Sequence, residues 1–242
     1  MSCGVLCQPI SDTLLFFYNH LCHNLGWAII SLTVAIRALL TPLTTPSLKV
    51  GQKMRELQPK LNKLKEECQG DKQLFAKKQL ELFKEHGVNP AAGCLPQIVQ
   101  IVILIALFQA FQSKLTDGSG LNTKFLYLDL TKPDMISIPS FTFLGMTINQ
   151  LPGIFLILAA LTQFLSSKLM MPAVKKEESA AKQTPGQSDD MAAAMQTQML
   201  YLFPLMTLII GFRFPSGLVL YWLVFSLVML VQQLWLTHEK KS

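Results

Sequence analysis

A single arginine lies inside an apolar stretch of this sequence, and few residue types have larger chemical consequences in such a place. Arg37 falls within residues 26–43, whose other polar members are Ser31, Thr33 and Thr41. Arginine keeps its proton, and placing it at a helix centre in a bilayer costs about 2.5 to 3.5 kcal/mol on insertion scales. Thr33 and Thr41 lie four residues before and after it, so one helix face is polar. We therefore expect Arg37 to face protein or water.

Polar side chains in other apolar stretches could line a hydrated groove together with this arginine. The candidates are Gln100, Gln163 and Trp222. No acidic residue lies in any of these stretches, so Arg37 has no obvious partner for a buried ion pair, and an open groove is favoured. The simpler structural alternative is an arginine that snorkels toward cytoplasmic phosphates or caps helix carbonyls.

Known catalytic and metal-binding patterns are absent from the sequence. There is no HExxH, GxSxG or phosphate-binding lysine loop, so bond-breaking chemistry is not expected. His20 and His23 have no acidic cluster near them, and the five cysteines follow no paired spacing. We expect a protein that is not an enzyme and that needs neither a metal nor a cofactor.

The composition is typical of a membrane protein. Of the 242 residues, 50% are hydrophobic and only 15% are charged, and the mean hydropathy is +0.36. The net charge of +6 could indicate nucleic-acid binding, but ten of the 21 Lys and Arg residues lie between Lys49 and Lys84, between two apolar stretches. That distribution suits a cytosolic loop beside anionic lipid, and no specific nucleic-acid partner is expected.

Five apolar stretches approach the length that a helix needs to cross a bilayer, so we predict an all-α membrane protein with five transmembrane helices. The first should end at the cluster of Pro42, Thr44, Thr45 and Pro46. The expected segments are an external N-terminal segment with an interfacial amphipathic helix (1–25), a first span (26–46), a cytosolic helical hairpin (47–90), a second span (91–112), an external loop (113–148), a third span (149–170), a cytosolic mobile loop (171–195), a fourth span (196–212), an external turn (213–216), a fifth span (217–236) and a cytosolic tail (237–242).

The distribution of basic residues predicts the orientation. Sixteen of the Lys and Arg residues lie in segments 47–90, 168–195 and 237–242, whereas four lie in the segments of the opposite side. By the positive-inside rule the N-terminus should be outside and the C-terminus in the cytoplasm. Residues 11–24 are too short and polar to span, and they predict an amphipathic helix on the outer surface.

Four motifs together resemble the YidC/Oxa/Alb family of membrane proteins. They are AIRALLTPLT (35–44), KMRELQPKL (53–61), EHGVNPAAGCLPQIVQ (85–100) and FPSGLVLYWLVFSLVMLVQQ (214–233), in the order and with the spacing of that family. Two positions depart from the family pattern, namely Ala92 in place of glycine and Val102 in place of proline. Both departures concern the second span and leave Arg37 unaffected.

The resemblance implies a compact insertase of a bacterial inner membrane, with a groove open to the cytosol and lipid. Arg37 would be the groove arginine, Thr33 its neighbour and Trp222 an aromatic lining residue, whereas Thr41, Gln100 and Gln163 are added here from polarity alone. Implied partners are nascent membrane proteins, the lipid bilayer, the ribosome, the signal recognition particle receptor and the Sec translocon. A transporter or channel for an anionic solute is the alternative function, and a membrane scaffold is a third.

Overall fold

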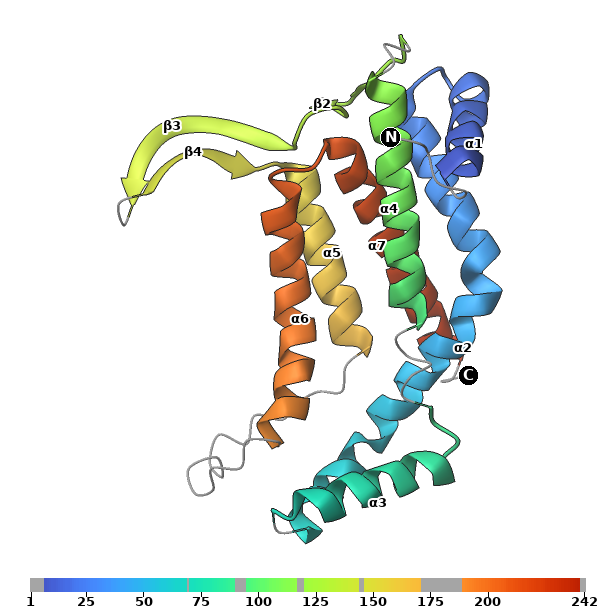
Figure 1. Cartoon of the computed structure of the whole chain (residues 1–242), viewed down its shortest axis with the longest axis vertical. Coiled ribbons are helices and arrows are strands. Elements are labelled where there is room, and N and C mark those ends of the chain that lie inside the picture. Colours follow the sequence, from blue (N-terminus) through green and yellow to red (C-terminus); the bar gives the residue numbers. More distant parts are fainter. Residues whose placement is uncertain are drawn as a thin grey trace.

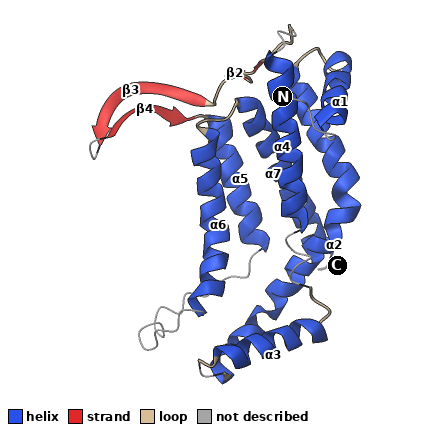
Figure 2. Ribbon diagram, viewed as in Figure 1, coloured by secondary structure: helices blue, strands red, loops and turns tan. Residues whose placement is uncertain are grey.

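The computed structural model describes residues 7–68, 70–89, 95–116, 120–143, 146–170 and 189–239 (Figures 1 and 2). Its helices are α1 (Cys7–His20), α2 (Leu25–Glu67), α3 (Lys72–Glu85), α4 (Leu95–Thr116), α5 (Ile154–Met170), α6 (Asp189–Gly211) and α7 (Ser216–Glu239). Its strands are β1 (Lys124–Phe125), β2 (Leu128–Asp129), β3 (Met135–Phe143) and β4 (Met146–Pro152). The fold is mostly helical, but the strands show that an all-α description is incomplete.

The first helix ends earlier than the sequence predicted. Helix α1 stops at His20 because Cys22 and His23 adopt left-handed backbone angles, with φ of 59° and 45°. Its Leu14 and Tyr18 are buried against α2 and α4. Cys7 takes part in a disulfide bond, which the irregular cysteine spacing did not predict.

Helix α2 does not end at its proline cluster, so that prediction was wrong. It runs from Leu25 to Glu67 through Pro42, Pro46 and Pro59. Each proline lacks the N–H that a helix interior uses, but threonine hydroxyls beside the first two bond nearby carbonyls. Thr44 donates to the Leu40 carbonyl at 3.0 Å, and Thr45 donates to the Thr41 carbonyl at 2.7 Å. Packing against α7 supports the same stretch, and Figure 1 shows α2 changing direction in its lower half.

Helix α7 lies between two parts of the bundle. It packs against α2 on one side and α5 on the other, and α6 packs against α5 (Figure 1). One apolar cluster joins α1, α2, α4 and α7 through residues such as Ile29, Leu107 and Tyr221. A second joins α5 to α7 through Leu156 and Val219. Thr33 and Arg37 of α2 are buried within this packing.

Strands occupy much of the predicted external loop. β3 pairs antiparallel with β4, and this hairpin projects away from the bundle (Figure 2). The predicted third span should have started at residue 149, but residues 149–152 belong to β4 and α5 begins at Ile154. The Asp134 carboxylate, which lies 22 residues earlier in the sequence, accepts the Leu156 N–H at 2.9 Å and so caps the start of α5.

The fourth span also differs from its predicted bounds. Helix α6 begins at Asp189, so residues 189–195 are helical where a mobile loop was expected. The rest of that predicted loop, from residue 171 to 188, lies outside the described residues. Helix α6 contains Pro204 and ends at Gly211, and the backbone then turns through Arg213 into α7.

The second half of α2 and α3 fold against each other at the lower end in Figure 1. Their small apolar core contains Leu57, Leu61, Phe83 and Val88. Asp71 caps α3 by accepting the N–H groups of its first turn. Arg55 of α2 donates to the Leu169 carbonyl near the end of α5 at 2.9 Å, which ties this helical pair to the bundle.

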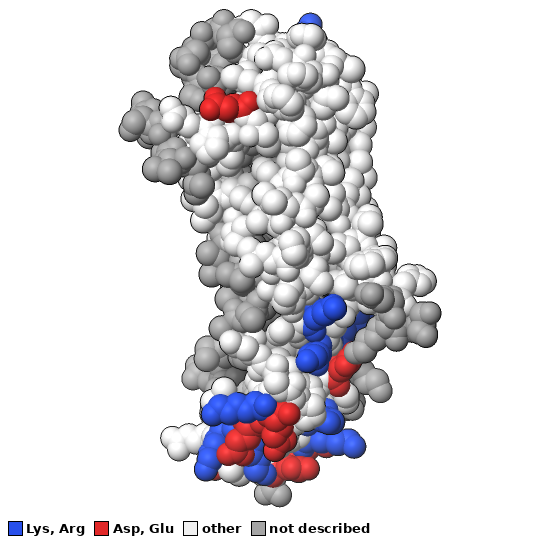
Figure 3. All heavy atoms as spheres, turned by 90° about the vertical axis from the view of Figure 1, so that its right-hand side faces the viewer, with Lys and Arg blue, Asp and Glu red and all other residues white. Residues whose placement is uncertain are grey.

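Apolar helices and charged residues are separated along the molecule. Among the described residues, Leu25–Glu67 and Ser216–His238 are long and apolar enough to cross a membrane, and shorter apolar helices cover Val99–Gln112, Ile154–Leu169 and Leu200–Gly211. Figure 3 shows Lys and Arg gathered at the end formed by α2 and α3, beside an almost uncharged trunk. This pattern is typical of a protein whose trunk lies in lipid.

The loop between β2 and β3, which bonds the first residues of α7, should respond to pH. The Thr131 hydroxyl and backbone hold the pKa of Asp129 below its ordinary value, and the Lys132 charge adds to this effect. Because the pKa of Asp129 is lower in the folded than in the unfolded protein, the ionised carboxylate stabilises the loop above about pH 4. This stabilisation is lost as the pH falls through the folded pKa and the carboxylate is protonated. We expect hydrogen exchange at the Thr131 amide, corrected for the pH dependence of the intrinsic exchange rate, to accelerate as the pH falls below about 4. Asp129→Asn should remove this pH dependence, and an unchanged dependence would contradict the assignment.

Candidate functional site

A polar stripe runs along one side of α2. Thr33, Arg37, Thr41, Thr45 and Lys49 follow each other at four-residue intervals, which places them close together on a helix surface. Each threonine donates its hydroxyl proton to the carbonyl four residues earlier, at 2.6 to 2.7 Å. The hydroxyl oxygens keep lone pairs as acceptors, and that of Thr45 accepts from the Gln232 side chain of α7 at 3.2 Å. Only the two basic residues of the stripe are strong donors.

Arg37 is the most enclosed charge in this stripe. Its side chain is only 4% exposed, and its guanidinium carbon lies 4.0 Å from the centroid of the Phe225 ring on α7. Its Nε and Nη2 atoms are buried and have no hydrogen-bond partner in the described part of the chain. Within the same ranges no Asp or Glu forms an ion pair with it. Arg37 is thus a buried cation held by an aromatic ring, with donors left for another molecule or for water.

Helices α4 and α7 add a second pair of polar groups beside this arginine. The Tyr221 hydroxyl donates to the Gln100 side-chain carbonyl at 3.3 Å, and both side chains are buried. Tyr221 also lies close enough to Arg37 for an electrostatic interaction. The Gln100 amide nitrogen has no partner among the residues that the structure describes. Gln100, Tyr221 and Arg37 therefore bring α2, α4 and α7 together around polar groups.

Two predicted groove residues are engaged elsewhere in the structure. Gln163 of α5 accepts a hydrogen bond from the Thr207 hydroxyl of α6 at 2.6 Å. Trp222 packs edge-on against Phe214, with ring centroids 6.4 Å apart, and joins the α5 and α7 cluster. In the described ranges neither side chain has a hydrogen bond or ring contact with Arg37. The contacts described for Gln163 and Trp222 are thus with residues other than Arg37, and Trp222 also packs against the cluster that joins α1, α2, α4 and α7.

Tyr221 and Phe225 were not singled out in the sequence. They lie one helical turn apart on α7; Phe225 contacts Arg37, and the Tyr221 hydroxyl donates to Gln100. The only signal was their spacing of four within an apolar helix, which also describes ordinary core or lipid-facing aromatic residues. No group of three or more potential metal-ligating side chains occurs among the described residues.

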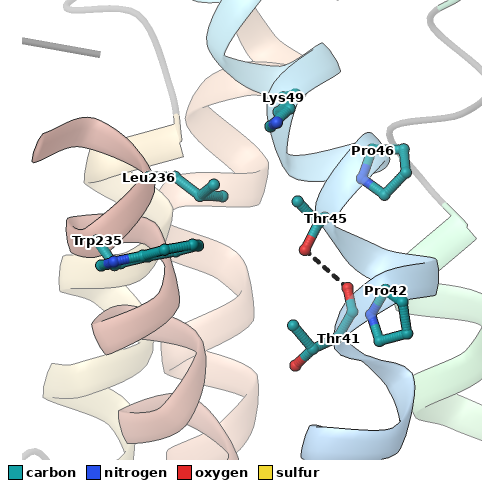
Figure 4. A pocket seen from close by; sticks show the side chains of 7 residues that line it. All are labelled: Thr41, Pro42, Thr45, Pro46, Lys49, Trp235 and Leu236. Atoms are coloured by element: carbon teal, nitrogen blue, oxygen red, sulfur yellow. Dashed lines mark hydrogen bonds between the residues drawn. The ribbon is translucent and has the colours of Figure 1, made fainter. Parts of the chain in front are cut away.

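An open cavity begins one turn from Arg37, between α2 and α7. It has a volume of about 490 Å³. Figure 4 shows the α2 residues opposite Trp235 and Leu236 of α7, with Lys49 at one end. The lining residues are Thr41, Pro42, Thr45, Pro46, Lys49, Trp235 and Leu236. The polar stripe therefore continues from the enclosed arginine into a cavity on the side of the charged end.

The sequence matches known inner-membrane proteins over most of its length. Residues 16–242 match the family described as 60Kd inner membrane protein. A membrane protein insertase YidC of Fusobacterium nucleatum is 37% identical over 210 residues, which cover 87% of this chain and 84% of that protein. An insertase YidC of Syntrophobacter fumaroxidans is 32% identical over 97% of this chain but only 38% of its own length. The YidC 1 insertase of Halalkalibacterium halodurans is 30% identical over 95% of this chain and 76% of its own length.

Proposed function

This chain belongs to the YidC/Oxa/Alb family of inner-membrane proteins, and we propose that it inserts newly made membrane proteins through a polar groove that contains Arg37. One observation carries the proposal: the arginine is 4% exposed, yet two of its nitrogen atoms have no protein partner in the described residues. A buried cation with unused donors is costly unless another molecule or water meets them. A client segment with a polar or acidic side chain has the matching chemistry.

The proposed topology has five spans, formed by the first half of α2 and by α4, α5, α6 and α7. The N-terminus lies outside and the C-terminus in the cytoplasm, so α2 and α3 extend into the cytosol. The separation of charge in Figure 3 supports this orientation.

The proposed route for a client begins at the cavity between α2 and α7. Lys49 lies at its cytosolic end, and the threonine oxygens lead from it toward Arg37. Those oxygens can accept hydrogen bonds from client N–H groups, whereas Arg37 donates to client oxygens. The polar segment thus meets a partial replacement for water within the bilayer. The apolar helix of the client then leaves into lipid, driven by burial of its own apolar surface.

The proposed cytosolic pair, α2 and α3, offers a surface for partners that deliver clients. It is rich in Lys and Arg, and Leu74 and Leu80 of α3 are exposed. The ribosome, the signal recognition particle receptor and the Sec translocon are the proposed partners. No nucleotide or metal is needed for the proposed mechanism, because the client's own burial in lipid supplies the driving force.

Purified protein in liposomes separates the proposed function from transport of an anionic solute. We expect a small single-span client to become protected from added protease when the chain is present, and no increase in flux of chloride or phosphate. Liposomes that hold a heat-unfolded sample are the control. Anion flux without client insertion would contradict the insertase proposal and favour a transporter.

A further inference from the structure

The aromatic ring over Arg37 has a definite place in the bundle. Phe225 lies on α7, one turn after Tyr221, and its half-buried ring packs against the cluster that joins α1, α2, α4 and α7. The guanidinium carbon of Arg37 lies 4.0 Å from its centroid. A guanidinium at this distance over a ring is attracted by the ring quadrupole, so the contact restricts the orientation of a long, flexible side chain.

The two unused nitrogen atoms of Arg37 lie on one edge of the guanidinium. Nε and Nη2 carry N–H groups that point the same way, and together they form one of the forks that bind a carboxylate through two parallel hydrogen bonds. Both atoms are buried without a partner in the described residues. A ring that contacts the face of the guanidinium does not occupy this hydrogen-bonding edge, which lies in the guanidinium plane. The guanidinium can therefore keep its contact with Phe225 while its Nε and Nη2 edge binds a ligand.

We propose that Phe225 is a positioning residue, which holds Arg37 so that its Nε and Nη2 edge receives a client carboxylate. This inference rests on the proposed insertase function, and it names the chemistry that the groove prefers. A carboxylate offers two oxygens in a plane, whereas an asparagine side chain offers one oxygen and no charge. Phe225 thereby sets the preference for clients whose translocated segment carries Asp or Glu.

A ring that only fills space makes a different prediction from a ring that orients the guanidinium. Phe225→Leu retains an apolar side chain of similar bulk but removes the quadrupole, whereas Phe225→Tyr retains the ring. Phe203 of α6 is 37% exposed and provides a matched control, because Phe203→Leu makes the same change away from Arg37. All variants are compared at equal amounts of folded protein in liposomes.

The first measurement is the ratio of insertion rates for two clients that differ by one Asp→Asn change in the translocated segment. We expect Phe225→Leu to lower the preference for the acidic client by about threefold or more, which is the size of a modest cation–π contact. Phe225→Tyr and Phe203→Leu should keep the ratio of the unmodified chain. An unchanged ratio in Phe225→Leu, or an equal fall in Phe203→Leu, would overturn the proposal.

A second measurement does not depend on insertion. Phenylglyoxal modifies arginine side chains, and mass spectrometry reports its attachment at Arg37. An acidic peptide with the client sequence should slow this modification in the unmodified chain and in Phe225→Tyr, but much less in Phe225→Leu, and the Asn peptide should protect none of them. Equal protection of Phe225→Leu by the acidic peptide would overturn the role of Phe225. Failure of the unmodified chain to insert any client would instead contradict the proposed function.

Discussion

Replacement of Arg37 by alanine is expected to slow client insertion by about 10- to 100-fold. That range corresponds to the loss of about 1.5 to 3 kcal/mol, the contribution of a hydrogen bond to a charged group. Arg37→Lys keeps the charge but lacks the planar fork, so it should retain more activity than Arg37→Ala and less than the unmodified chain. Depletion of the native insertase in a bacterium, followed by expression of each variant and protease protection of a small client, measures this effect.

The stability of the Arg37→Ala variant serves as an internal control. The Nε and Nη2 atoms of the arginine have no protein acceptor in the described part of the chain, so their removal leaves no acceptor unpaired. We therefore expect only the loss of the Phe225 contact, which is a fall in stability of about 0.5 to 2 kcal/mol. Arg213 lies exposed in the turn between α6 and α7, and Arg213→Ala removes the same charge elsewhere. Full insertion by Arg37→Ala for both acidic and neutral clients would contradict a role for the arginine charge.

Replacement of Asp134 by alanine is expected to destabilise the end of the bundle next to the strands by about 2 to 4 kcal/mol. Asp134 is only 1% exposed and accepts two hydrogen bonds of 2.9 Å, one from the Leu156 N–H and one from the Tyr127 hydroxyl. Its loss leaves both donors without this acceptor, and an unsatisfied buried group costs about 1 to 3 kcal/mol. Thermal unfolding in detergent and hydrogen exchange at the Leu156 amide measure the loss.

Two variants test the cause of that destabilisation. Asp134→Asn keeps one side-chain oxygen as an acceptor. It should lose roughly half as much stability as Asp134→Ala, or about 1 to 2 kcal/mol. Asp12→Ala removes an exposed carboxylate from α1 and should change stability little. Gly153 packs its backbone against the Asp134 carboxylate, so a side chain there would displace it. Unchanged exchange at Leu156 in Asp134→Ala would show that this carboxylate does not cap α5.

The sequence predicted those features that depend on residue type alone. Arg37 could be singled out because a charge in an apolar helix is costly wherever its neighbours lie. Thr33 and Thr41 followed from helical periodicity, and the structure places them on the same stripe. The roles of Gln163 and Trp222 stay predictions, because their contacts in this structure are with Thr207 and Phe214.

The features that the sequence did not reveal depend on contacts between distant segments. Phe225 looks like any aromatic residue in an apolar helix until α7 is packed against α2. The start of α5 depends on Asp134, which lies 22 residues before the amide it accepts. Helix α2 continues past Pro42 while it packs against α7, whereas the proline and threonine types alone predict a helix end.

The unbroken course of α2 has a mechanical consequence. Eighteen residues of one helix separate Arg37 from Arg55, which corresponds to about 27 Å along an axis that changes direction in its lower half. A force on the end of α2 that carries Arg55 is transmitted along the continuous helix, and the prolines are the points at which the helix bends most easily. The Arg55 bond to the Leu169 carbonyl is an anchor that such a force must break. A movement of the charged end of α2 is therefore passed along the helix to the segment that carries the buried arginine.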